Sequence, residues 1–425
     1  ERLEAVLHQL ELHQREISGD SYPYGLQLIL QALGCATHYS DPIAVLNLEP
    51  VIASLREKIQ QPDYIRELAR RLLLDNPHRV TLVMTPDRDL SAQRAEREAA
   101  RLADIKKSMD DRQRQAVVQL ATDLQQRQEQ VDDESILPKV ELSDVPAGLP
   151  ELAFRQRESN GLKITTYGQG TNGLVYQQAV APLPALTEAR LPLLPLYTNI
   201  LTELGLGADS YMDTQHRQSA TVGSISAMTS MRGKVDNEQE VSANFVLSSK
   251  ALLRNAEDQV QLMHDTLHSV RFDETARIRE LVSQQRARRE QAITGNGHGL
   301  AMAAACAGMS PLAQLNHRLS GLEGIRGIRA LDEDLRRTEG LESFAAGMLE
   351  LHQQVVSVPL QLLAIAEDEQ VDAVASRALE LWGGLSGSAQ DQGFALPAIR
   401  ERRGELWLTN TQVNFCARAY PTVPV

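Results

Sequence analysis

The segment LKITTYGQGTNGLVYQQAVA, residues 162–181, contains two strand patterns separated by a turn. Apolar and polar residues alternate in its first six and last eight residues, as in strands with one buried face. The residues between them, 168–173, have the spacing of a dinucleotide fingerprint, but a strand follows where a phosphate-binding helix should begin. We therefore predict no nucleotide site and a hairpin turn in which Asn172 and Gly173 adopt positive φ.

The chain downstream and just upstream of this segment continues a mixed pattern. Strands are expected at 151–157, 221–231, 241–249 and 360–366, and helices at 191–204, 210–218 and 368–381, with four more helices between 255 and 356. The fold class predicted from these elements is α+β.

The first part of the chain is mainly helical. Residues 1–76 have helical periodicity, with one helix beginning near residue 41 and another at 63–74, and residues 78–85 are expected to form a strand. Charged residues dominate 89–130, where the apolar spacing predicts two long helices broken near 108–111. Ser108 and Asp111 are candidate caps of the second helix. This hairpin is either a solvated coiled-coil spacer or a hinge between two halves of a larger molecule, and residues 132–150 are a linker.

A weak internal repeat suggests domain boundaries. The strands predicted at 78–85 and 360–366 each end in an acidic turn and lead into a helix. Two copies of one α+β domain would produce this arrangement, and they would end near residues 87 and 390.

Composition excludes several classes of protein. The 425 residues are 42% hydrophobic and 23% charged, which is typical of a folded protein with more than one core. A net charge of -13 makes nucleic acid an unlikely partner and suits cationic peptides better. No apolar run is long enough to cross a bilayer. The three cysteines are far apart, so the sequence predicts neither a disulfide framework nor a Cys-based metal site, and a reducing compartment is expected.

The histidines do not form a recognisable zinc motif. His8 and His13 flank Glu11, but a step of five residues turns about 140° around a helix and separates the two rings. His13 has Glu16 in the position of an inverted zinc motif, but Ile17 stands where the second His is required. Neither pair is therefore expected to chelate one ion.

Two further clusters are better explained by packing and solvation. His264 and His268 have the correct spacing for zinc but lack a neighbouring Glu, so we expect them to pack within the protein. The basic run at 286–289 shares its helix with acidic residues and is expected to be a solvated face. We assign no catalytic, metal-binding or cofactor-binding residue in this chain.

Several stretches resemble a known family, the pitrilysin/insulinase (inverted zincin) zinc peptidases of the presequence-protease type. The matching stretches are ERLEAVLH (1–8), LVMTPD (82–87), LPKVELSDVP (137–146), TNGLVY (171–176) and LTELGLG (201–207). In that family, four homologous α+β domains form two halves, which are joined by a helical hairpin and close around unfolded peptides.

The resemblance implies a domain map. Residues 1–87 would be the C-terminal part of the second peptidase-like domain, 88–148 the helical-hairpin hinge and linker, 149–390 the third domain and 391–425 the start of a truncated fourth domain. The family's His-x-x-Glu-His motif holds zinc in the first domain and has no counterpart in this sequence. The Arg and Tyr that the fourth domain contributes, the latter within Gly-Ala-Tyr-Gly, are also absent.

The resemblance further implies a function. The chain would be the non-catalytic hinge and opposing chamber wall of a zinc metalloendopeptidase that degrades unfolded peptides such as targeting presequences. By itself it would be inactive and hold no zinc. Its partners would be unfolded or basic amphipathic peptides and the missing N-terminal catalytic half, with no nucleic acid or membrane. The alternative is a naturally non-catalytic subunit that helps to bind substrate.

Both ends of the sequence have the pattern of a piece of a longer chain. The first residues have a mid-helix pattern without an initiator Met, and residues 411–419 are expected to form a strand without a partner. The expected location is the cytoplasm of a bacterium, or the matrix of a mitochondrion or chloroplast.

Overall fold

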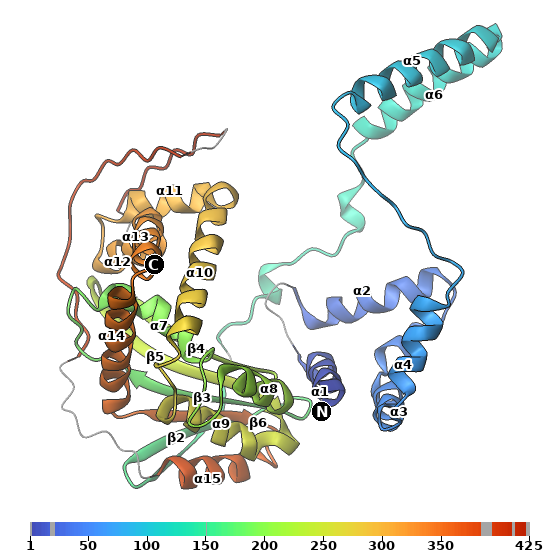
Figure 1. The fold of residues 1–425 in the computed structure, drawn as a ribbon. Coiled ribbons are helices and arrows are strands. Elements are labelled where there is room, and N and C mark those ends of the chain that lie inside the picture. The colour runs from blue at the N-terminus through green and yellow to red at the C-terminus, as the bar shows by residue number, and fades with distance from the viewer. Residues whose placement is uncertain (1, 18–21, 150, 384–392, 410–412, 422–425) are drawn as a thin grey trace. The chain divides into compact units, whose positions relative to one another are not determined.

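The computed structural model describes residues 2–17, 22–149, 151–383, 393–409 and 413–421. It has the α+β fold predicted from the sequence (Figure 1). The chain divides into two compact units, one formed by Glu1–Pro62 with Leu152–Val425 and the other by Asp63–Glu151. Each unit is described by itself.

A mixed sheet forms the centre of the larger unit (Figure 1). Its strands among the described residues are β1 (Arg155–Ser159), β2 (Leu162–Gly168), β3 (Leu174–Pro182), β4 (Ser224–Lys234), β5 (Asn237–Leu252) and β6 (Gln361–Ala366), in the order β1-β2-β6-β3-β5-β4. Only the pairing of β2 with β6 is parallel within this described sheet. The strands predicted from alternating residues are thus confirmed.

The predicted hairpin between β2 and β3 is wrong. Asn172 and Gly173 do have positive φ, at 54° and 77°. However, β6 lies between β2 and β3 and pairs with both, so residues 168–173 connect two strands that are not neighbours. The tight hairpin is instead at Asn160 and Gly161, with φ of 52° and 79°, which join β1 to β2.

Helices pack around this sheet and enclose one principal core. They are α7 (Leu194–Leu201) with a preceding 3-10 turn η5 (Leu191–Leu193), α8 (Tyr211–Thr221), α9 (Ala256–His268) preceded by η6 (Leu253–Asn255), α10 (Thr275–Gly295), α11 (Gly297–Cys306), α12 (Pro311–Ser320), α13 (Leu322–Asp334), α14 (Thr338–Ser357) and α15 (Val371–Trp382). Fully buried side chains such as Tyr197, Leu247 and Met348 join the sheet to the helices. No described helix is both long and apolar enough to cross a membrane.

The prediction of four helices between 255 and 356 is wrong, because six of the described helices, α9 to α14, lie there. Ser310 ends one helical stretch and caps the next, with its side chain accepting a bond from the Ala313 amide and with Pro311 at the first helical position. Gly321 separates α12 from α13. Short helices with continuous apolar patterns cannot be separated by periodicity alone.

The first 62 residues of the chain belong to the same compact unit. Their described helices are α1 (Arg2–Arg15), α2 (Tyr24–Thr37) and α3 (Glu49–Ile59), with a 3-10 turn η1 (Ala44–Leu46). The helix expected from residue 41 is therefore only a short turn. Helix α1 contacts both α3 and α8 and buries Leu7 and Leu12. These contacts link the beginning of the chain to the unit that contains the sheet.

The smaller unit is helical. Its elements are α4 (Tyr64–Ala69) continued by a π-helical turn η2 (Arg70–Leu74), α5 (Leu90–Ser108), α6 (Asp111–Glu129), η3 (Glu134–Ile136) and η4 (Leu142–Asp144). The two long helices predicted from charge and apolar spacing are confirmed, and Figure 1 shows them joined by a tight turn. The cap is neither Ser108 nor Asp111 but Asp110, which forms a capping box with Gln113.

The strand predicted at 78–85 is wrong. This segment is extended but pairs with no described strand, and the side chains of Val80, Leu82 and Met84 are 77–90% exposed. A strand needs a neighbour that accepts its backbone hydrogen bonds, and a β-branched alternating pattern does not supply one. Of the predicted repeat, the structure therefore contains only the later copy, β6 followed by α15. In the segment expected as a strand at 411–419, residues 413–419 are not a strand, and 411–412 lie outside the described residues.

Candidate functional site

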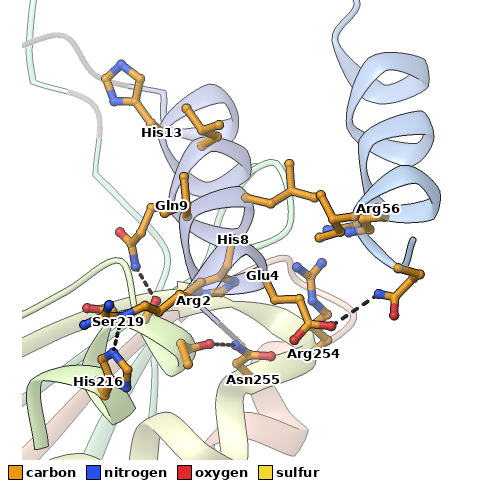
Figure 2. Close-up of a pocket in the computed structure, with 17 residues that line it drawn as sticks. Arg2, Glu4, His8, Gln9, His13, Arg56, His216, Ser219, Arg254 and Asn255 are labelled. Carbon is orange, nitrogen blue, oxygen red and sulfur yellow. Dashed lines mark hydrogen bonds between the residues drawn. The ribbon is translucent and has the colours of Figure 1, made fainter. Parts of the chain in front are cut away.

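A pocket of about 1060 Å³ opens where α1, α3 and α8 meet (Figure 2). Its lining combines apolar side chains of α1, including Val6 and Leu10, with a polar rim. Arg2 on one side approaches His216 of α8, with 3.4 Å between Nε and Nε2. The pocket is therefore bounded by the first helix of the chain and by elements far along the sequence.

Glu11 lies at the centre of an ion-pair network beside this pocket. The residue is 1% exposed, and its carboxylate accepts hydrogen bonds from Arg254 at 3.0 and 2.6 Å, from Arg15 at 3.1 Å and from Arg56. Burial by itself raises the pKa of a carboxyl group, but the bonds and charges of these guanidinium groups outweigh it and lower the pKa of Glu11 to about 2. Glu11 is thus a fully ionised buried anchor between α1, α3 and the end of the sheet.

His8 faces the pocket one turn before Glu11 (Figure 2). It is 7% exposed, and its Nε2 atom has no hydrogen-bond partner among the described residues. Burial, followed by the positive charge of Arg254, lowers the pKa of His8, which keeps the ring neutral at pH 7. His13 is exposed, and Figure 2 shows it away from His8, so the two rings do not converge on one ion.

Further polar contacts connect α1 to the rest of the unit. The Gln9 side chain donates to the Ser219 carbonyl at 2.8 Å and to the Val222 carbonyl at 2.7 Å, and Lys250 of β5 pairs with Glu16. These contacts and the Glu11 network satisfy polar groups on both sides, as in an interface rather than in a reacting centre.

His264 and His268 pack together in the hydrophobic core. Their ring centroids are 4.6 Å apart, and both rings meet the buried Trp382 edge-on, at 5.5 and 5.9 Å. Burial, and then the neighbouring His264, lowers the pKa of His268. The structure thus supports the packing interpretation of this pair.

The basic run at 286–289 is not simply a solvated face. Arg286 donates to Asp332 at 2.8 Å and to Glu290 at 3.2 Å, and Arg289 donates to the Leu319 carbonyl at 2.7 Å. Two of its three guanidinium groups therefore hold neighbouring helices together, which corrects the prediction. Alternation of charges along one helix could not reveal partners on α12 and α13.

Sequence analysis missed one cluster of potential metal ligands. His317, Glu323 and Glu405 each place one ligand atom within 4.8 Å of the others. Glu405 is remote in sequence and lies in a segment without regular structure. No local motif could have joined it to the other two residues.

A comparison with protein families identifies the class of protein that contains this fold. The family model described as "Peptidase M-16C associated" matches residues 84–331, which is more than half of the chain. The chain belongs to this family. Its match covers α5, α6, the first five strands and the helices through α12.

The curated relatives are presequence proteases, which confirms the resemblance found in the sequence. The mitochondrial presequence protease of Xenopus tropicalis is 26% identical over 410 residues, and that of Danio rerio is 24% identical over 404 residues; each alignment covers 95% of this chain and 39% of the relative. Presequence protease 1 of Arabidopsis thaliana, described as chloroplastic/mitochondrial, is 26% identical over 364 residues, covering 84% of this chain and 33% of the relative. The chain thus spans about two-fifths of the length of the first two relatives.

One solved structure shares part of the fold. A conserved protein from Enterococcus faecalis V583 superposes with a TM-score of 0.42 at 11% identity, over 57% of this chain and 54% of the other.

Proposed function

We propose that this chain is the hinge and opposing chamber wall of a zinc metalloendopeptidase that degrades unfolded peptides such as targeting presequences. The proposal rests on one observation: the chain aligns over 95% of its length with presequence proteases, but its 425 residues contain no His-x-x-Glu-His. The catalytic zinc would then belong to the N-terminal half of the parent, and the chain by itself would have no peptidase activity.

The role of such a wall is physical rather than chemical. In the parent, the zinc would supply Lewis-acid activation of a water molecule and of the scissile carbonyl. A second half that closes over an extended peptide excludes bulk water and restricts the orientation of the peptide, and both effects accelerate the reaction. One wall alone remains open to solvent.

The charge of the chain supports peptides of a particular kind as substrates. Its net charge of -13 attracts unfolded basic amphipathic peptides and disfavours nucleic acid. The relatives are named as mitochondrial or chloroplastic, so the matrix of such an organelle, or the cytoplasm of a bacterium, is the proposed location.

Cleavage of a fluorogenic cationic peptide tests this proposal. The chain alone should give no cleavage, the full-length parent should cleave, and the parent should lose turnover when its zinc-motif Glu is changed to Gln or when the segment corresponding to this chain is removed. Chelator-sensitive cleavage by the purified chain would contradict the proposal. A parent that has zinc ligands but no peptidase activity would instead favour a non-catalytic, substrate-binding partner subunit.

A further inference from the structure

His317 is a buried histidine whose ring nitrogens lack hydrogen-bond partners. It lies on α12, is 0% exposed, and neither nitrogen has such a partner among the described residues. Its Nε2 atom is nevertheless 3.3 Å from Glu405 Oε2 and 4.0 Å from Glu323 Oε1. A buried polar ring without partners is costly, so the ring requires either a proton or a ligand that lies between it and the carboxylates.

The local backbone explains why these groups meet. Gly321 lies between α12 and α13, and a Cβ atom at this position would come within 2.7 Å of His317 Nδ1. The close approach allowed by glycine brings Glu323, in the first turn of α13, back toward the ring. Leu315 and Leu319 are buried on the same helix and hold α12 against the core.

Glu405 is held by its own neighbours. The Trp407 Nε1 atom donates to Glu405 Oε2 at 2.7 Å, and the Trp407 ring meets the His317 ring edge-on at 6.1 Å. The guanidinium group of Arg326 lies 5.2 Å from the centre of the Trp407 ring. An outer hydrogen bond that orients a ligand carboxylate is a common feature of metal sites.

The charges around the ring leave room for a cation. Two carboxylates approach one imidazole, and the nearest described guanidinium, that of Arg403, is 3.8 Å from Glu405 Oε1 but 3.0 Å from Glu401. Zn²⁺ would neutralise both carboxylates and give the imidazole nitrogen a partner. One nitrogen and two carboxylate oxygens form a ligand set that suits Zn²⁺ better than Mg²⁺ or Ca²⁺.

We propose that His317 Nε2, Glu323 and Glu405 bind one Zn²⁺ ion, with water as a further ligand. Zinc ligands about 2.1 Å from the metal are about 3.4 Å apart in a tetrahedral site, and the separation of His317 Nε2 from Glu405 Oε2 is 3.3 Å. Glu323 has to move by less than about 1 Å to complete the same geometry. Its side chain is 27% exposed, as the side chain of Glu405 is 21% exposed, so water can reach the ion.

Zinc titration of the chelator-treated, dialysed 425-residue chain tests this site. Calorimetry and elemental analysis should give one zinc per chain, and Co²⁺ should produce the visible absorption of a tetrahedral site. Glu323→Gln and Glu405→Gln should each weaken zinc binding by about tenfold or more, because each removes a charged ligand without changing side-chain size. Mg²⁺ should bind far more weakly.

Matched variants separate this site from other sources of binding. Glu401→Gln changes a neighbouring, half-exposed carboxylate and should leave zinc binding unchanged. His268→Gln changes the histidine pair of the core and should also leave it unchanged.

Absence of zinc binding by the wild-type chain would overturn the proposal, since a proton on His317 would then satisfy the two carboxylates. Stoichiometric zinc that survives Glu405→Gln, or that is lost with His268→Gln, would also overturn it. The proposal is independent of peptidase activity, so its test does not depend on the proposed function.

Discussion

At the scale of single residues, Glu11 shows how one buried charge can connect distant parts of a chain. Three guanidinium groups, from α1, α3 and the turn that precedes α9, converge on its carboxylate. Removing one partner of a buried, paired charge costs more than the pair contributes, because the remaining charges lose their compensation. The network therefore makes the docking of α1 sensitive to a single substitution.

Glu11→Gln should destabilise the chain by about 3–5 kcal/mol, because three buried or half-buried guanidinium groups would lose their counter-charge. The measurement is urea unfolding at pH 7, monitored by tryptophan fluorescence and circular dichroism. Glu57→Gln, on the exposed side of α3, is the control and should change stability by less than about 0.5 kcal/mol. Equal effects of the two substitutions would show that the network contributes nothing specific.

The same residue predicts a pH dependence. The pKa of Glu11 is about 2 in the folded chain, against an ordinary value of 4.5, so the unfolded chain binds the proton more readily. The resulting stabilisation, about 3 kcal/mol, is fully present above pH about 4.5 and is lost as the pH falls toward about 2. Unfolding measured between pH 6 and pH 3 should therefore show a stability that falls less steeply for Glu11→Gln than for the wild type. Parallel pH profiles would contradict this assignment.

At the scale of elements, the turn between α5 and α6 depends on one cap. Asp110 has extended φ and ψ, accepts a bond from the Gln113 amide at 2.7 Å, and donates its own amide to the Gln113 side chain at 3.0 Å. Asp111 is the next residue, and its side chain is 96% exposed. The sequence placed the helix break correctly but selected the neighbouring residue as the cap.

Asp110→Ala should cost the start of α6 about 1 kcal/mol, which corresponds to about fivefold faster amide exchange in its first turns. Asp111→Ala is the matched control and should have a smaller effect, since it removes only a charge near the helix N-terminus. Hydrogen exchange with mass spectrometry on the full chain measures both variants. A larger effect at Asp111 would show that the capping geometry is wrong.

At the scale of the whole molecule, the two compact units predict how the chain responds to a protease. The linker at 131–149 is exposed, contains only two short 3-10 turns among its described residues, and follows the end of α6. The segment at 75–89 is also exposed and irregular. Exposed, irregular backbone can enter a protease site without unfolding a packed core.

Limited proteolysis should therefore begin within 131–149, with 75–89 as the next site. The two products of the first cut should separate in denaturant but elute together under native conditions, because residues 1–62 pack with the unit that contains the sheet. Glu11→Gln should weaken this association. First cleavage between residues 160 and 250 would show that the assignment of the packed α+β unit is wrong.

Much of this protein could be inferred from the sequence because burial leaves a local periodic pattern. Alternation in residues 162–181 predicted β2 and β3, helical spacing predicted α5 and α6, and motif-like stretches indicated the presequence-protease family. The domain boundaries inferred from the same patterns stay predictions. The absence of a zinc motif is equally a property of the sequence.

The tertiary structure decided which distant residues meet. It placed β6 between β2 and β3, left residues 78–85 without a paired strand, surrounded Glu11 with guanidinium groups, and brought Glu405 to His317. Periodicity records which face of an element is buried, but not what covers that face. Strand partners and side-chain clusters depend on contacts between residues that are far apart in the chain, and only the folded backbone brings those residues together.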